Sequence, residues 1–410
     1  MRTRPSTEGH ADLCRRQTLR HNLKRPSQHD RGRVFAKDMR CGGRRTGRFR
    51  ARMLQGRQIT PDGGFLEDRR WFPIDLDRST GAIQFADMGT DRRLTWNEFL
   101  EIAAGERQVP LKNLPARDAF SLVARNPEPA RINFIWHTSY CCSTAIASAL
   151  DVPGRNMSIF EPQLLVSVAG ARRDADKMRR GDISWLSDAA FHLLGRPYFE
   201  DASVTIKPAP VSNCLVEEAA AKTKGKMLFL YADCRSFLLA AMRYGENRRR
   251  IVRHLFNVIY RDEEATARWT PESVAGLTDL EIAGLAWQLM IARFENCLNR
   301  FGSRAASLDC DAFLENPREV LAKIWNFLEL PGSVEESALY SDPKFLTCHA
   351  KYADRAFARE ARLAAEKGLS PEIVGEIDKT VEAVMAQFPQ GSGTLPLPNA
   401  LATAQKALTQ

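Results

Sequence analysis

The most informative segment of the chain is Phe134-Ile-Trp-His-Thr-Ser-Tyr-Cys-Cys-Ser-Thr-Ala-Ile-Ala-Ser-Ala-Leu150. Its pattern predicts a buried apolar strand, a loop of small residues, and a helix that begins at Ser143 and Thr144. Such a loop turns successive backbone N–H groups toward one point, and the helix start adds further donors. The segment therefore predicts an anion cradle, although ordinary Ser/Thr capping of a helix gives the same pattern. It is not a nucleoside triphosphatase loop, because the required glycines and lysine are missing.

Outward from this segment, short apolar runs alternate with longer amphipathic stretches, as in parallel sheets joined by crossover helices. We expect strands at 132–136, 157–160, 204–206, 227–231 and 305–308. We expect helices at 143–150, 162–169, 214–223, 237–244, 280–301, 317–328 and 371–388. The fold class predicted from this order is α/β, with a mainly parallel sheet covered by helices on both faces.

Charge and composition divide the chain into four parts. Residues 1–57 contain 17 Lys and Arg against four Asp and Glu, a net charge of +13, whereas the rest of the chain carries −4. We therefore expect a disordered basic arm at 1–60, because so charged a segment with few aromatic side chains cannot bury a core. A small N-terminal β/α cap with a linker is expected at 61–130, the α/β domain at 131–390 and a flexible tail at 391–410.

The basic arm and the cysteines limit the possible functions. The arm is either a solvated tail, an extension produced by a misassigned start with Met53 as the true start, or an electrostatic attachment to nucleic acid or anionic lipid. Its lack of interleaved aromatics disfavours the nucleic-acid alternative. None of the nine cysteines forms a C-x-x-C pair, so we expect no metal and reduced thiols in the cytoplasm. No apolar stretch is long enough to span a membrane.

Five motifs fall at the predicted strand ends. They are F-I-x-H-T-x-x-x-x-S-T from residue 134, Ile159-Phe-Glu-Pro-Gln-Leu-Leu, Val204-Thr-Ile-Lys-Pro, Leu228-Phe-Leu-Tyr-Ala-Asp-Cys-Arg-Ser-Phe-Leu and Asp309-Cys-Asp-Ala-Phe-Leu-Glu-Asn-Pro-Arg-Glu-Val-Leu. In this order they resemble the bacterial sulfotransferase family, over roughly residues 65–388.

The resemblance implies a three-layer sandwich like that of P-loop nucleoside triphosphate hydrolases. It also implies 3′-phosphoadenosine-5′-phosphosulfate (PAPS) as the sulfuryl donor. The corner at Arg235 and Ser236 would lie near the 3′-phosphate, and the late segment with His349 and Lys351 would approach the nucleotide. The 5′-phosphosulfate would be held by the loop residues Thr138, Ser139, Tyr140, Cys141, Cys142, Ser143 and Thr144.

The chain departs from the family pattern at two places. Tyr140 stands where family members commonly have Lys or Arg, and Cys142 stands where they commonly have Gly. Eight residues after Arg235 the chain has Arg243 rather than Ser, so Arg235, Arg243 and the run 248–250 are candidate phosphate ligands. A solvated basic face is the alternative interpretation of that run.

Sulfuryl transfer needs an aligned donor, positive potential at the departing oxygen and a base for the acceptor. Lys207 ends an apolar strand on the side where ligands bind in open α/β folds, which makes it the candidate cation. Glu161 also follows a strand and is the candidate base, and His137 is a candidate donor to the sulfonate. Each has a structural alternative: a solvated lysine, a carboxylate that complements a helix dipole, and a hydrogen-bonded histidine.

The sequence therefore predicts a cytoplasmic, PAPS-dependent sulfotransferase. It would move a sulfuryl group to a hydroxyl or amine of a small-molecule or glycan acceptor. Two other classes stay open: a non-catalytic relative that binds a nucleotide or partner in the same cleft, and a nucleic-acid-associated protein that works through the basic arm. No motif fixes the acceptor or the oligomeric state.

Overall fold

The computed structural model describes residues 63–89, 101, 107–123, 131–177, 183–196, 203–243, 245–262, 271–342, 345–346, 348–349, 352–356, 368–388 and 393–404. All of them lie in one compact unit, Arg57–Gln410. The expected basic arm and Lys351 lie outside the described residues. Within those residues, no helix combines the length and the apolar character needed to cross a membrane.

A five-stranded sheet forms the centre of the fold, and each pair of neighbouring strands is parallel. The strands are short apolar runs, which is the pattern expected where a sheet is buried on both faces. All five overlap the ranges predicted from the sequence. In spatial order they are β5 (Asn156–Phe160), β6 (Ser203–Lys207), β4 (Ile132–His137), β7 (Met227–Tyr231) and β8 (Ala305–Asp309).

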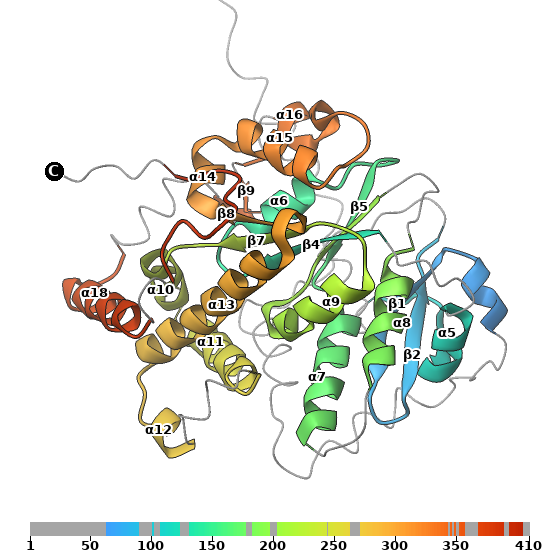
Figure 1. Cartoon of the computed structure of the whole chain (residues 1–410), viewed down its shortest axis with the longest axis horizontal. Coiled ribbons are helices and arrows are strands. Elements are labelled where there is room, and N and C mark those ends of the chain that lie inside the picture. The colour runs from blue at the N-terminus through green and yellow to red at the C-terminus, as the bar shows by residue number, and fades with distance from the viewer. Residues whose placement is uncertain are drawn as a thin grey trace, which may run out of the picture. The chain divides into compact units, whose positions relative to one another are not determined.

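Helices cover both faces of this sheet (Figure 1). Because side chains alternate along a strand, Phe134 and Trp136 enter one core while Ile135 between them enters the other. The core of Ile135 includes residues of α6 (Ser143–Ala149), α14 (Cys310–Glu315), α15 (Pro317–Phe327) and α16 (Ala338–Ser341). The core of Phe134 includes residues of α7 (Gln163–Lys177), α8 (Ser184–Leu194), α9 (Val216–Lys222), α10 (Cys234–Met242), α11 (Glu246–Ile259) and α13 (Asp279–Phe301). The predicted three-layer α/β sandwich is confirmed.

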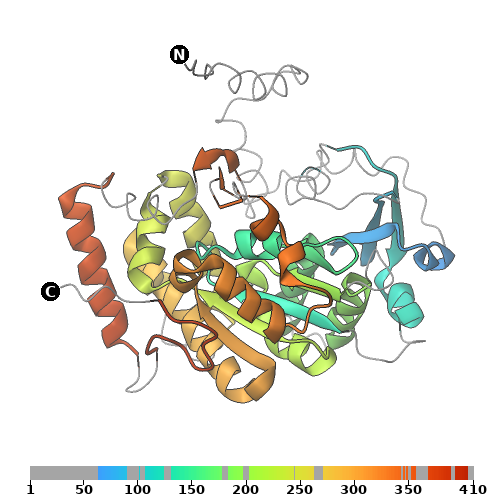
Figure 2. The same cartoon turned by 90° about the horizontal axis from the view of Figure 1, so that it is seen from above.

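Smaller elements complete this domain. Helix α18 (Pro371–Ala386) packs against α13 and α10, and in Figure 2 it lies at the outer side of the α10–α13 group. Two short strands, β9 (Cys348–His349) and β10 (Tyr352–Ala356), pair antiparallel. The remaining elements are α12 (Pro271–Ala275), η2 (Pro210–Leu215), η4 (Gly302–Arg304) and η5 (Val334–Glu336).

The N-terminal cap is a separate, antiparallel sheet in the order β1 (Trp71–Asp77), β2 (Ala82–Asp87) and β3 (Leu111–Pro115). It is accompanied by η1 (Gly63–Glu67) and α5 (Ala116–Val123). Phe85 and Leu114 are fully buried and belong to the same core as the central sheet. The cap therefore shares its core with the α/β domain, through α7 and α8.

The C-terminal segment 393–404 lies along the central sheet. The Ser307 N–H donates to the carbonyl of Asn399 at 3.0 Å, and the Leu401 N–H donates to the carbonyl of Ser307 at 2.9 Å. Leu397 is only 1% exposed, and its N–H donates to the Tyr231 hydroxyl at 3.2 Å. The composition of residues 391–410 predicted a flexible tail, whereas residues 397–401 contact β7 and β8.

Candidate functional site

The carboxyl ends of the central strands bring three predicted residues to one edge of the sheet. His137 ends β4, Lys207 ends β6, and Glu161 follows β5 directly. Phe160 lies opposite Lys207, so Glu161 comes next to the end of β6. This is the edge at which open α/β sheets bind their ligands.

The loop between β4 and α6 has an unusual backbone. Ser139, Tyr140 and Cys142 have φ angles of 72°, 54° and 61°, in the left-handed region that disfavours side chains with a Cβ. Residues in such conformations turn consecutive N–H groups toward one concavity, which suits an anion. The loop ends at Cys142, which caps α6 without a side-chain hydrogen bond.

Hydrogen bonds to β7 and to His137 hold this loop. The Thr138 N–H donates to the Leu230 carbonyl at 3.2 Å, and the Cys141 thiol donates to the same carbonyl at 3.6 Å. The Ser139 N–H donates to Nδ1 of His137 at 3.1 Å. Ser143 and Thr144, the first residues of α6, are 6% and 7% exposed.

His137 shapes the loop. Its side chain is buried, and because Nδ1 accepts the Ser139 N–H, that nitrogen carries no proton. Its backbone carbonyl accepts from Nδ2 of Asn213 in η2, at 3.4 Å. These contacts correspond to the structural alternative for His137, while its predicted contact with a sulfonate stays a prediction.

Lys207 and Glu161 form an ion pair at the sheet edge. The Nζ of Lys207 donates to Oε1 of Glu161, and the Glu161 N–H donates to the Lys207 carbonyl at 2.7 Å. The Lys207 side chain is fully buried, and that of Glu161 is 21% exposed. Glu161 has a φ of 46°, so its backbone is also in the left-handed region. Lys207 therefore does not reach solvent, in contrast to the alternative considered from the sequence.

The charge of Lys207 acts on the loop. Burial raises the pKa of the Cys141 thiol to about 12, the neighbouring Cys142 adds to the increase, and the positive charge of Lys207 opposes it. The buried ammonium of Lys207 thus lies close enough to Cys141 to influence the β4–α6 loop electrostatically. The described residues include six non-glycine residues with positive φ. Three of them belong to this loop, and a fourth is Glu161.

Strain of this kind is informative about function. A left-handed conformation costs about 1–2 kcal/mol for a residue with a Cβ. Residues of this type collect at binding and catalytic sites, where the surrounding structure maintains them. Four such residues at one sheet edge, next to a buried ammonium, single out this edge as the candidate site.

Tyr140 connects the loop to two helices of the adjacent layer. Its ring centroid lies 5.4 Å from that of Phe237 in α10. The guanidinium carbon of Arg248 in α11 lies 4.4 Å from the centroid of the Tyr140 ring. The run 248–250, for which the sequence left open phosphate binding and a solvated basic face, therefore places one arginine against the loop.

The second predicted corner follows β7. The Asp233 carboxylate accepts from the Ser236 N–H at 3.0 Å and caps α10. Nε of Arg235 donates to Asp378 of α18 at 2.8 Å. Arg243 is the exposed residue at the end of α10. The structure therefore brings the loop, Glu161, Lys207 and His137 together, whereas the contact found for Arg235 is with α18.

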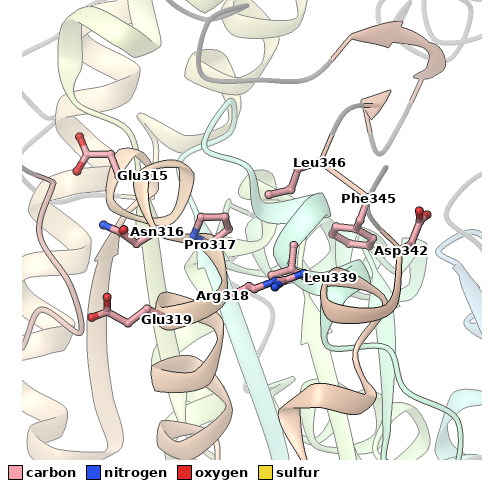
Figure 3. A pocket seen from close by; sticks show the side chains of 9 residues that line it. All are labelled: Glu315, Asn316, Pro317, Arg318, Glu319, Leu339, Asp342, Phe345 and Leu346. Atoms are coloured by element: carbon pink, nitrogen blue, oxygen red, sulfur yellow. The ribbon is translucent and has the colours of Figure 1, made fainter.

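A surface pocket lies elsewhere, between α14, α15 and α16. It has a volume of about 470 Å³, and none of the predicted site residues lines it. Figure 3 shows Glu315 and Glu319 on one side of it and Asp342 on the other. Because both acidic and basic side chains line this pocket, it gives no indication of an anion site. Its lining residues are Glu315, Asn316, Pro317, Arg318, Glu319, Leu339, Asp342, Phe345 and Leu346.

One contributor to the site, Asn213, was missed by sequence reasoning, and Arg248 was named only as part of the run 248–250. Asn213 follows the end of β6 by six residues, and its signal was the polar pair Ser212-Asn213 after a proline-rich turn. Arg248 had a clearer signal: Val252, Leu255, Phe256 and Ile259 follow at helical spacing and are buried. That pattern identifies α11 as an amphipathic helix packed on the core.

Among the residues that the structure describes, no group of three or more His, Cys, Asp or Glu is arranged to hold a metal ion. Six described cysteines are free thiols. No model of a protein family and no curated protein matches the chain.

Solved structures with a similar fold do exist. The sulfotransferase domain from the curacin biosynthetic pathway is 12% identical, with a TM-score of 0.39 over 63% of this chain and 99% of that one. A sulfotransferase from Mycobacterium avium is 14% identical, with a TM-score of 0.34 over 65% of this chain and 83% of that one. Retinol dehydratase, solved with retinol and PAP, is 13% identical, with a TM-score of 0.35 over 73% of this chain and 98% of that one.

Two of these three proteins are sulfotransferases, the family that the sequence motifs resemble. At such identities and TM-scores the likeness carries no argument about activity.

Proposed function

We propose that the chain is a sulfotransferase that moves a sulfuryl group from PAPS to a hydroxyl or amine of a small-molecule or glycan acceptor. The observation that carries this proposal is the fully buried Lys207, paired with Glu161 beside a loop in the left-handed conformation. A buried ammonium is costly unless it is paired, and such groups are kept where a charge is needed.

The loop residues fit an anionic donor. The N–H groups of the segment 139–144 would hold the 5′-phosphosulfate, because the positive φ values turn them toward one concavity. The exchange of Gly for Cys at position 142 leaves this backbone intact, since Cys142 adopts a φ of 61°. Cys142 differs from Gly in carrying a Cβ, which would narrow the space next to the sulfonate.

Lys207 and Glu161 fit the two chemical demands of the transfer. When bound, the donor supplies an activated sulfuryl group whose bond to the bridging phosphate oxygen breaks as the bond to the acceptor forms. Lys207 would stabilise negative charge on the departing oxygen. Glu161 would accept the proton of the acceptor's hydroxyl or amine. Because its carboxylate is partly exposed, the acceptor would have to enter at the face where Glu161 lies.

The proposal also covers the 3′-side of the nucleotide, the cellular location and the metal requirement. Arg235, Ser236, Arg243 and Lys351 stay candidates for the nucleotide's 3′-side, with Lys351 outside the described residues. A cytoplasmic location is proposed because the six described cysteines are free, as is usual in reducing compartments. We propose that the protein works without a metal.

The proposal is tested by nucleotide binding. The protein should bind adenosine 3′,5′-bisphosphate, the product of the transfer, and should be retained on a resin that carries it but not on an ATP resin. Replacing Ser143 and Thr144 by leucine should abolish binding, because bulky side chains would fill the cradle. A folded variant with unchanged affinity would remove the loop from the site, and a wild-type protein that ignores the bisphosphate would contradict the proposed function.

A second outcome distinguishes the non-catalytic alternative. Tyr140 removes the usual cation from the loop, so binding without turnover is the behaviour expected of a nucleotide-binding relative. Release of bisphosphate from PAPS in the presence of a panel of hydroxyl and amine acceptors separates the two functions. Turnover supports the enzyme, and tight binding without any turnover supports the binding protein.

A further inference from the structure

The three consecutive arginines of α11 have different surroundings. Arg249 pairs with Asp279 at 3.2 Å, and Arg250 pairs with Glu246 at 2.5 Å. Arg248 instead lies over the ring of Tyr140 and donates from Nη1 to the Ala240 carbonyl at 2.7 Å. These two contacts hold the guanidinium of Arg248 between the β4–α6 loop and α10.

The position of Arg248 is fixed from two sides. The Ala240 carbonyl belongs to the last turn of α10, where carbonyls have no partner inside the helix. The ring of Tyr140 is itself held against the buried Phe237. A planar guanidinium suits this arrangement, because it can stack on a ring while its N–H groups donate in the plane.

We propose that Arg248 supplies the positive charge that the β4–α6 loop lacks in its own sequence, and that it acts on the 5′-side of the donor nucleotide. The inference rests on the proposed function. Tyr140 lies inside the loop, with its backbone in the left-handed conformation, and the guanidinium carbon of Arg248 lies 4.4 Å from the centroid of its ring. A cation held beside a partly buried anion site stabilises a bound phosphate.

The experiment compares three ligands: adenosine 3′,5′-bisphosphate, adenosine 5′-phosphate and adenosine 3′-phosphate. Arg248→Gln should weaken binding of the two ligands with a 5′-phosphate by about tenfold or more. Its affinity for adenosine 3′-phosphate should stay within about twofold of the wild type. Arg249→Gln is the matched control, because it removes the same charge one residue away, and it should change none of the three affinities by more than about twofold.

Loop variants provide a second, independent measurement. Tyr140→Leu removes the ring under the guanidinium and should give the same selective loss for 5′-phosphates. The double variant Arg248→Gln/Tyr140→Leu should lose no more affinity than either single variant, because both remove one interaction.

The outcomes separate this inference from the proposed function. If the wild type binds none of the three ligands, the proposed function fails. If the wild type binds but Arg248→Gln binds equally well, or loses affinity for all three ligands alike, Arg248 only joins two helices and the inference is overturned. Equal effects of Arg248→Gln and Arg249→Gln would overturn it as well, because they would show a general effect of surface charge.

Discussion

The ion pair between Lys207 and Glu161 gives the most direct test of the site. Lys207→Met replaces a fully buried ammonium by an apolar side chain of similar length and leaves the Glu161 carboxylate without that partner. Breaking a buried pair in this way costs about 3–5 kcal/mol. Because Glu161 is 21% exposed, water partly compensates for the loss, so we expect the lower end of that range, about 3 kcal/mol.

The reverse substitution should be the more harmful one. Glu161→Gln leaves the ammonium of Lys207 fully buried without its carboxylate, and water cannot compensate at 0% exposure. We expect its cost near the upper end, about 5 kcal/mol. The double variant Lys207→Met/Glu161→Gln removes both charges and should recover to within about 1 kcal/mol of the wild type, because a neutral replacement of a buried pair is often well tolerated.

Urea unfolding of the four proteins measures these free energies, and turnover measures function. Lys207→Met should lower turnover by about 10²–10³, the loss seen when one preorganised electrostatic donor is removed. In Glu161→Gln the acidic limb of the pH–rate profile should disappear. The double variant should regain stability without regaining activity. The reasoning would be refuted if the double variant lost as much unfolding free energy as the two single variants together. Turnover of Lys207→Met within a few-fold of the wild type would refute it as well.

Three further predictions concern the rest of the molecule. Gly225→Ala should destabilise the protein by more than about 2 kcal/mol, because an added Cβ would meet the Ile132 carbonyl at 1.8 Å. Gly375→Ala is the control, because its Cβ would meet nothing within 4 Å, and it should stabilise the protein by about 0.5–1 kcal/mol. Urea unfolding measures both effects. Burial raises the pKa of Cys234 to about 12, above its value in the unfolded chain. Stability should therefore fall above about pH 9, by up to about 1.4 kcal/mol per pH unit relative to Cys234→Ala, and an unchanged difference up to pH 11 would contradict this. A chain that begins at Gln58 should keep its thermal midpoint and nucleotide binding, since Arg57–Gln410 is a compact unit. Tight binding of duplex DNA or RNA near physiological salt, weakened steeply by added salt and lost on truncation, would instead give the basic arm a function.

The central sheet could be predicted because its strands are short apolar runs that end in turn signals or polar residues. Met227–Tyr231 is apolar throughout and is flanked by Gly225 and Asp233, which mark its ends. The edge strand Leu111–Pro115 was missed, because only Leu111 and Leu114 are apolar and its proline suits a linker equally well. The pattern of a half-exposed edge strand is too weak to separate from a loop.

The candidate site was predicted in its positions but not in its contacts. Strand ends are visible in a sequence, and parallel strands bring their carboxyl ends to one edge, so Lys207 and Glu161 were placed correctly at that edge. Their pairing was not visible, because two charges separated by 46 residues have no local signature. The sequence analysis assigned them two separate roles, and the structure shows that each one sets the environment of the other.

Tyr140 shows why a departure from a motif is weak evidence for lost function. A motif records which residue type stands at one position, whereas an anion responds to the charge around it regardless of the segment that supplies it. Tyr140 removes a cation from the loop, but its ring supports the guanidinium of Arg248, which comes from a helix more than a hundred residues further along the chain. An aromatic residue at the position of a cation can therefore keep positive charge at the loop by recruiting it, provided that a neighbouring helix presents an arginine. Under the proposed role of Arg248, the activity of a chain with such a loop depends on α11 as much as on the loop itself.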